Sequence, residues 1–137
     1  MVEAATSQVK AKGRPTSPHL SIYRQEITMV MSIVHRITGT ALYVGMLLLA
    51  WWLIAAAVGP DHYAFVQNIL TSWFGRLVMV GFTWALMHHM LGGIRHLIWD
   101  TGRALDLVSV DRMAWATLAG SIALTALLWL VLGARGL

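Results

Sequence analysis

The chain has 137 residues, of which 58% are hydrophobic and only 12% carry a formal charge. Soluble domains usually contain about 25% charged residues, so this composition excludes an ordinary soluble fold and indicates an integral membrane protein. The absence of cysteine excludes disulfides, thiolate metal sites, cysteine-ligated iron–sulfur clusters and covalently attached c-type haem. The net charge of +4 fits basic residues at the membrane edges, and no nucleic-acid partner is expected.

Residues 1–26 form a polar segment that we expect at the cytoplasmic or matrix face. Gly13, Pro15 and Pro18 interrupt helix formation there. No signal peptide is evident, because the first apolar run begins near Ile27 and continues directly into a full-length span. We therefore expect the first helix to act as its own insertion signal.

Three long apolar intervals follow, and each can cross the hydrocarbon core as a helix that rises about 1.5 Å per residue. We predict spans at about residues 28–58, 70–99 and 112–134, within one membrane domain over residues 27–137. Transmembrane strands are a poor alternative, because they are shorter and alternate in polarity. The predicted fold class is all-α, with three transmembrane helices.

The distribution of basic residues predicts the orientation of these helices. Four Lys or Arg residues precede the first span, and the second connection carries Arg95, Arg103 and Arg112. The first connection, residues 60–73, has none. The positive-inside rule therefore places the N-terminus and the second connection on the cytoplasmic or matrix side.

Polar side chains inside membrane helices are costly, so they mark candidate functional positions. The first group is Ser32, His35, Arg36, Thr38 and Gly39. All of these except Thr38 share one helical face through their i, i+3, i+4 and i+7 spacing. A single arginine near a span end commonly just extends to the interface, and hydroxyls bond back to helix carbonyls. A hydroxyl, an imidazole and a fixed cation on one face favour instead a site for a carbonyl ligand or a carboxylate.

The second group lies near the end of the second span. Small residues spaced four apart form a ridge that contains a histidine: Gly81, Ala85, His89 and Gly93. Helix packing alone explains the glycines. An imidazole in lipid without a partner is costly, however, and neutral imidazole is a common ligand of haem iron. The adjacent His88 points about 100° away from His89.

Both groups lie toward the same side of the membrane, so they can serve one pocket. By the helical rise, His89 lies roughly 10–15 Å below Trp99. His35 and Arg36 are placed to pair with haem propionates, whose charge needs compensation in a low dielectric. A six-coordinate haem needs a second axial ligand, and no second histidine lies at a comparable depth. We therefore expect that ligand from another chain.

Three motifs, in order, resemble those of the succinate dehydrogenase cytochrome b subunit, the large membrane anchor, in its alphaproteobacterial and mitochondrial branch. Residues 14–23, RPTSPHLSIY, resemble its proline-rich N-terminal motif. Residues 32–39, SIVHRITG, and residues 89–100, HMLGGIRHLIWD, resemble its S-I-x-H-R-x-[ST]-G and H-x-x-x-G-I-R-H-L-x-x-D motifs. The resemblance covers about residues 14–103, and the third helix that the family requires follows.

The resemblance implies a membrane anchor and haem b-binding subunit of succinate:quinone oxidoreductase, respiratory complex II. His89 matches the axial ligand of the haem iron, and His35 and Arg36 match residues near the haem propionates. Ser32 and Arg36 match positions that bind ubiquinone, and Asp100 matches an acidic residue near the path of proton supply. Such a chain catalyses nothing alone but is a subunit of an enzyme.

The resemblance also implies partners and a location. A second membrane anchor subunit would supply the other haem ligand and pack with this chain into a larger helical bundle. Electrons would pass from succinate through a flavoprotein subunit and an iron–sulfur subunit to ubiquinone. The complex would lie in the lipid bilayer of a bacterial or mitochondrial inner membrane.

Three other interpretations remain open at this stage. A fumarate reductase anchor of similar shape would oxidise quinol instead. A small non-redox transporter usually carries charged residues near the membrane midplane, whereas the deep interiors of these spans contain only histidines and hydroxyls. A structural anchor that has lost haem is disfavoured by His89.

Overall fold

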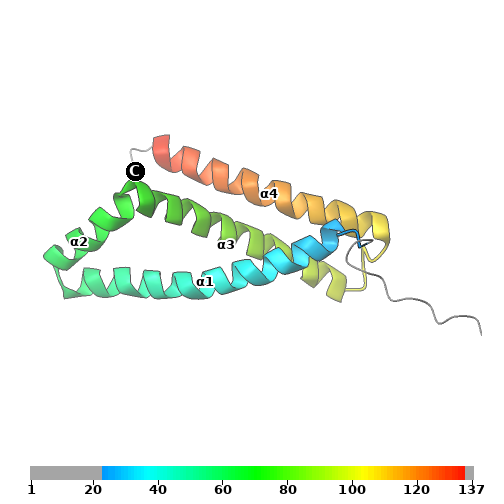
Figure 1. The fold of residues 1–137 in the computed structure, drawn as a ribbon, viewed down its shortest axis with the longest axis horizontal. Coiled ribbons are helices and arrows are strands. Elements are labelled where there is room, and N and C mark those ends of the chain that lie inside the picture. Colours follow the sequence, from blue (N-terminus) through cyan, green and yellow to red (C-terminus); the bar gives the residue numbers. More distant parts are fainter. Residues whose placement is uncertain (1–22, 135–137) are drawn as a thin grey trace, which may run out of the picture.

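The computed structural model of the chain describes residues 23–134, so the N-terminal motif at residues 14–23 lies outside them except for Tyr23. The predicted polar segment, residues 1–26, likewise falls mostly outside. The described residues form four helices and no strand (Figure 1). The helices are α1 (Ile27–Val58), α2 (Pro60–Thr71), α3 (Trp73–Asp100) and α4 (Leu107–Ala134).

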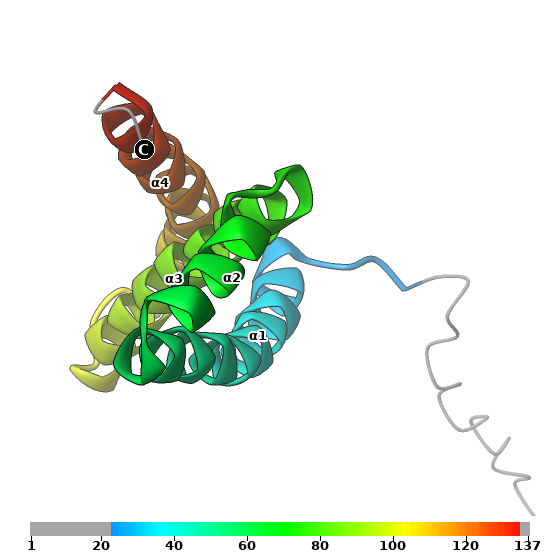
Figure 2. The ribbon, with the colours of Figure 1, turned by 90° about the vertical axis from the view of Figure 1, so that its left-hand side faces the viewer.

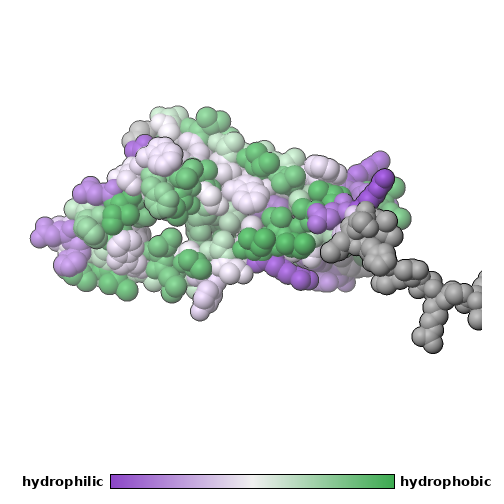
Figure 3. All heavy atoms as spheres, viewed as in Figure 1, coloured by the Kyte–Doolittle hydropathy of each residue, from purple (hydrophilic) through white to green (hydrophobic). Residues whose placement is uncertain are grey.

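Helices α1, α3 and α4 are each long and apolar enough to cross a membrane. The prediction of an all-α fold with three membrane helices is therefore confirmed. Only 11–17% of the most apolar stretch of each helix is buried inside the chain. Hydrophobic side chains cover the middle of the molecule, and hydrophilic ones gather toward its two ends (Figure 3). Most apolar side chains therefore face lipid or other protein.

The central element is α3, which contacts each of the other three helices. Figures 1 and 2 both show it between α1 and α4. Three buried hydroxyl residues spaced four apart, Thr117, Ser121 and Thr125, face inward from α4. Each hydroxyl donates to a carbonyl of its own helix, at 2.8 Å in all three cases. Satisfied in this way, these short side chains allow close helix packing in an apolar medium.

Residues 60–71 fall within the predicted first connection but form a separate helix, α2. The turn before α2 depends on Gly59, whose φ of +146° is a conformation that favours glycine. Pro60 then occupies the first turn of α2, where its missing N–H costs nothing. Val66 is buried, and Trp52 Nε1 of α1 donates to Gln67 Oε1 at 3.3 Å. These contacts hold α2 against the end of the bundle.

The turn between α3 and α4 ends at an N-cap. Gly102 and Ala104 have φ values of +75° and +55°, which reverse the chain over a few residues. The carboxylate of Asp106 then accepts a hydrogen bond from the backbone N–H of Ser109 at 3.0 Å. This contact satisfies a free amide at the start of α4. Hydrogen bonds from Ser109 lower the pKa of the Asp106 carboxyl below its ordinary value.

Removal of this cap should loosen the first turn of α4. We expect Asp106→Ala to speed amide hydrogen exchange in residues 107–110, measured by mass spectrometry in detergent, whereas Asp106→Asn retains an acceptor and slow exchange. Because the folded-state pKa is lowered, the cap is complete above the ordinary pKa of aspartate. It weakens as the pH falls through the lowered value. Equal exchange in wild type and Asp106→Ala at neutral pH would contradict this role.

Candidate functional site

Helices α1 and α3 bring two predicted site residues, His35 and His89, face to face. Their ring centroids lie 4.0 Å apart, and the ring planes differ by only 11°. His35 Nε2 donates to the carbonyl oxygen of His89 at 3.3 Å, and His89 Nδ1 donates to the carbonyl oxygen of His35 at 3.1 Å. Each imidazole thus satisfies one nitrogen on the backbone of the opposite helix. We call these two residues the histidine pair.

Two glycines make room for the histidine pair. A Cβ atom at Gly39 of α1 would lie 3.0 Å from Cε1 of His89, and one at Gly92 of α3 would overlap the ring of His35. Each helix therefore carries a glycine opposite the histidine of its neighbour. The ridge predicted from sequence contained Gly93 instead, whose added Cβ would meet nothing within 4 Å. The approach of α1 to α3 therefore depends on Gly92 and leaves the side of Gly93 open.

Thr38 belongs to the polar group predicted on the first span, where its hydroxyl was expected only to bond back to a helix carbonyl. Its side chain is only 2% exposed, and its hydroxyl donates to the carbonyl oxygen of His35 at 3.0 Å. The hydroxyl oxygen also lies 3.4 Å from Nδ1 of His89. Two acceptors therefore face Nδ1, which assigns the proton to that nitrogen and leaves a lone pair on Nε2. The signal in the sequence was a hydroxyl three residues after a membrane histidine.

A third histidine extends the site toward the end of α3. The ring of His96 meets that of His35 edge to face, with centroids 5.4 Å apart. Trp99 packs against His96 at 5.1 Å and 87°. Among residues 23–134, no three metal-binding side chains are grouped so that they could hold an ion. In this part of the chain the histidines therefore offer single ring nitrogens rather than a complete metal cage.

The other predicted site residues lie at the margin of the histidine pair. Ser32 is half-buried, whereas Arg36 and Asp100 are exposed. Within residues 23–134, no side-chain hydrogen bond joins any of the three to the histidines. Asp100 is the last residue of α3, roughly 16 Å along the helix from His89 at 1.5 Å per residue. The structure thus brings His35 and His89 together. The polar groups of Ser32, Arg36 and Asp100 make no hydrogen bond to this pair.

His88 belongs to a different part of the molecule. It is completely buried between α3 and α4, with Nδ1 at 3.4 Å from the hydroxyl oxygen of Ser121. The ring of Trp84 covers it at 5.3 Å. Because the Ser121 hydroxyl already donates to the carbonyl of Leu118, its oxygen serves His88 as an acceptor. His88 is therefore a core residue, and its neighbour His89 faces α1.

An apolar groove of about 320 Å³ runs between α1 and α3 beside the histidine pair. Two of its residues, Ala85 and Gly81, precede His89 by one and two helical turns. An added Cβ at Gly81 would meet nothing within 4 Å, so this side of the ridge is open. The lining residues are Ala41, Val44, Gly45, Leu48, Val78, Gly81, Phe82 and Ala85. The lining ends at Ala85, so the groove lies one helical turn from His89 along α3.

Comparison with known proteins agrees with this architecture. Residues 10–128 match the protein family described as succinate dehydrogenase/fumarate reductase transmembrane subunit. The chain belongs to this family. The resemblance inferred from the three motifs is thereby confirmed, and the chain is a membrane subunit of this class of oxidoreductase.

Individual relatives cover most of the chain. The succinate dehydrogenase cytochrome b556 subunit of Paracoccus denitrificans is 39% identical over 91% of this chain and 96% of its own length. That of Rickettsia felis is 39% identical over 90% of this chain and 97% of its own. The mitochondrial cytochrome b560 subunit of Sus scrofa is 37% identical over 69% of this chain and 57% of its own. Bacterial and mitochondrial relatives thus each match more than two thirds of this chain.

The two glycines of the site should be more sensitive to substitution than a glycine that faces open space, such as Gly133. We expect Gly92→Ala to destabilise the chain by about 1–3 kcal/mol, because its methyl group would displace the His35 ring in a packed interface. Gly39→Ala should cost less, since it meets only a ring edge at 3.0 Å. The measurement is the unfolding midpoint in an SDS titration.

Gly133→Ala is the matched control for these variants. An added Cβ there would meet nothing within 4 Å, and alanine has the higher helix propensity. Its midpoint should therefore stay the same or rise. If Gly92→Ala behaves like Gly133→Ala, the close contact at the histidine pair is wrong.

Proposed function

We propose that the chain is the haem b-binding membrane anchor of a succinate:quinone oxidoreductase and forms part of its ubiquinone-reduction site. The observation that carries the proposal is the state of His89. Its Nδ1 donates to a backbone carbonyl, which leaves the lone pair of Nε2 for iron, and an apolar groove begins one helical turn away at Ala85. Histidines that ligate metals characteristically donate their other ring N–H to such an acceptor, which fixes the tautomer and the ring orientation.

The residues present fit a haem group. Iron ligation uses the lone pair in the plane of the imidazole, so the stacking of His35 on the ring face does not block it. The groove beside Ala85 and Gly81 is apolar and free of bulky side chains on one side. On this proposal His89 binds the iron, and His35 and Arg36 compensate the propionate charges. When bound, haem b would supply a one-electron redox centre.

The position of His88 supports the assignment of the ligand to His89. His88 has an acceptor in Ser121, is sealed between α3 and α4 and does not reach the groove. His35 also donates to a carbonyl of the neighbouring helix, but the family motif matches His89 to the axial ligand and His35 to a residue near the propionates. The second axial ligand is assigned to the partner anchor subunit, with which this chain would complete a larger helical bundle.

The quinone site is proposed at Ser32 and Arg36. They are one helical turn apart on α1, and in the described residues their side chains are not committed to the histidines. A hydroxyl and a guanidinium can both donate to a quinone carbonyl. The guanidinium also stabilises the negative charge that develops as two electrons reduce the quinone. Two protons must be taken up in this step, and exposed Asp100 is proposed to relay them.

The proposed setting is an inner membrane, with the N-terminus on the cytoplasmic or matrix side. Electrons from succinate would arrive through a flavoprotein subunit and an iron–sulfur subunit docked on that side. The family name covers fumarate reductases as well as succinate dehydrogenases. The three relatives described above all carry the name succinate dehydrogenase, which favours ubiquinone reduction over quinol oxidation.

The ligand assignment is tested by a dithionite-reduced minus oxidised visible spectrum of the complex in mild detergent. We expect a b-type band in the wild type and its loss in His89→Ala. Thr38→Val should weaken haem retention about 10–100-fold, because it removes an acceptor that orients the ligand.

The matched control is His88→Ala, which should keep the band in every complex that assembles. A band that persists in His89→Ala would assign the ligand to another residue. Absence of a band from the wild-type complex would remove haem from the proposal.

The quinone site is tested by comparing two electron acceptors. We expect Arg36→Gln to lower quinone reductase kcat/KM about 10–100-fold, because a hydrogen bond to a charged group contributes about 1.5–3 kcal/mol. Ser32→Ala should lower it less. Succinate oxidation with a soluble dye should remain unchanged.

Arg24→Gln provides the matched control, because Arg24 is exposed just before the start of α1. It should leave both activities at the wild-type level. A loss of dye reduction in Arg36→Gln would indicate damage to assembly rather than to quinone binding.

A further inference from the structure

The inward face of α3 carries buried nitrogen atoms that lack hydrogen-bond partners within residues 23–134. They are Nε2 of His88, Nε and Nη1 of Arg95, and Nε1 of Trp99. Spacings of seven and four residues place these side chains on one stripe of the helix. The arginine and tryptophan nitrogens can only donate hydrogen bonds. The upper part of this stripe therefore requires an acceptor.

Arg95 is the only charged donor in this stripe, and it is the one buried charged side chain among residues 23–134. Its side chain is only 4% exposed, and its guanidinium lies over the ring of Trp99 at 5.1 Å. A buried guanidinium is strongly disfavoured unless an acceptor of opposite charge compensates it. The tryptophan ring covers one face of the guanidinium and leaves the N–H groups at its edge without acceptors.

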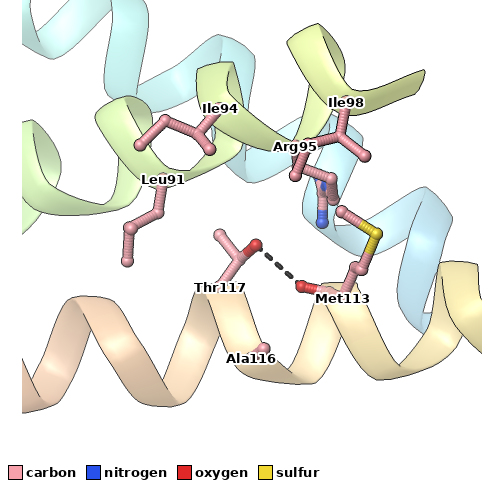
Figure 4. Close-up of a pocket in the computed structure, with 7 residues that line it drawn as sticks. All are labelled: Leu91, Ile94, Arg95, Ile98, Met113, Ala116 and Thr117. Carbon is pink, nitrogen blue, oxygen red and sulfur yellow. Dashed lines mark hydrogen bonds between the residues drawn. The ribbon is translucent and has the colours of Figure 1, made fainter. Parts of the chain in front are cut away.

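Arg95 also lines a cavity of about 150 Å³ between α3 and α4. Figure 4 shows the Arg95 side chain pointing from α3 toward α4, among apolar side chains. The hydroxyl of Thr117 donates to the carbonyl of Met113 at 2.8 Å and is the only hydroxyl in the lining. The other residues that line the cavity with Arg95 are Leu91, Ile94, Ile98, Met113 and Ala116.

This cavity is separate from the residues proposed for haem and quinone. It lies between α3 and α4, whereas the histidine pair and the apolar groove lie between α3 and α1. None of Ser32, Arg36 and His89 lines it. The function proposed above assigns no role to Arg95, although it is part of the matched motif at residues 89–100.

The lining selects a ligand with two parts. The donors of Arg95 require an oxygen anion, and Ile94, Ile98 and Met113 require an apolar chain attached to it. Exposed Arg103 and Arg112, near the end of α3 and the start of α4, are balanced by exposed Asp100, Asp106 and Asp111, so the positive charge at the cavity is that of Arg95 itself. Basic pockets between transmembrane helices, near the cytoplasmic or matrix surface of the membrane, bind phospholipid head groups.

We propose that the cavity between α3 and α4 binds a membrane phospholipid, with its phosphate accepting a hydrogen bond from the guanidinium of Arg95. One acyl chain lies against Ile94, Ile98 and Met113 along the surface of the bundle. The lipid thereby compensates a charge that no described residue of the chain compensates. This proposal does not depend on haem or ubiquinone, and its test uses neither.

The test is native mass spectrometry of the complete complex, purified from membranes in mild detergent. We expect the wild type to retain a phospholipid adduct, and Arg95→Gln to lower the retained fraction at least tenfold. Arg76→Gln is the matched control, since Arg76 is exposed on the same helix roughly 28 Å away, at 1.5 Å per residue. It should retain the adduct as the wild type does.

A second variant keeps the charge and removes the space. Ala116→Trp changes an exposed residue of the lining, so it is tolerated by the fold and should displace the lipid equally. If the Arg95→Gln complex does not assemble, the lipid content of Ala116→Trp shows whether lipid occupies the cavity. After delipidation, phosphatidylglycerol in mixed micelles should restore the adduct in the wild type and in neither cavity variant.

Three results would overturn the proposal. Unchanged lipid retention in Arg95→Gln or Ala116→Trp would show that lipid does not occupy the cavity. Displacement of the adduct by excess inorganic phosphate alone would identify a free-anion site. Release of a partner subunit from Arg95→Gln with lipid unchanged would identify a carboxylate of that subunit as the true acceptor.

Discussion

The close approach of α1 to α3 is the constraint on which the rest of the described structure depends. It exists because Gly39 and Gly92 each leave the space of a side chain to a histidine of the opposite helix. The same approach lets each histidine donate to a carbonyl of the other helix. Packing and chemistry are therefore set by one contact. Any change that separates the two backbones also breaks the hydrogen bond from Nδ1 of His89, so the proton is no longer fixed on that nitrogen.

The central helix divides polar side chains between two neighbours. Its face toward α1 carries His89, with an open groove beside it, whereas its face toward α4 carries His88 and Arg95. In an apolar medium the hydrophobic effect does not hold helices together, so small residues and hydrogen bonds must do so. Glycines provide close contact on the first face, and short hydroxyl residues on α4 provide it on the second. Each face thus combines tight packing with polar groups that have a specific use.

Much of this arrangement could be predicted from the sequence, because apolar length and motif spacing are local properties. The all-α membrane fold and the pairing of the motifs around His35 and His89 are of this kind. Helix α2 was missed because its twelve residues are too polar and too short to register as a span. Gly92 and Gly93 could not be distinguished, since only the crossing of two helices decides which one faces His35. The cavity at Arg95 needs α3 and α4 together, and spacing within one helix does not show it.

The small buried fraction of each long helix has a consequence for the life of the chain in a cell. A subunit that hides so little of its apolar surface gains most of its stability from neighbours. Made in excess, it would present long bare helix faces to the bilayer and to other membrane proteins. Quality-control proteases recognise such loosely packed segments, because these segments unfold locally at little cost in free energy. A chain with so little of its apolar surface buried would therefore be exposed to such proteases whenever it is present without neighbours.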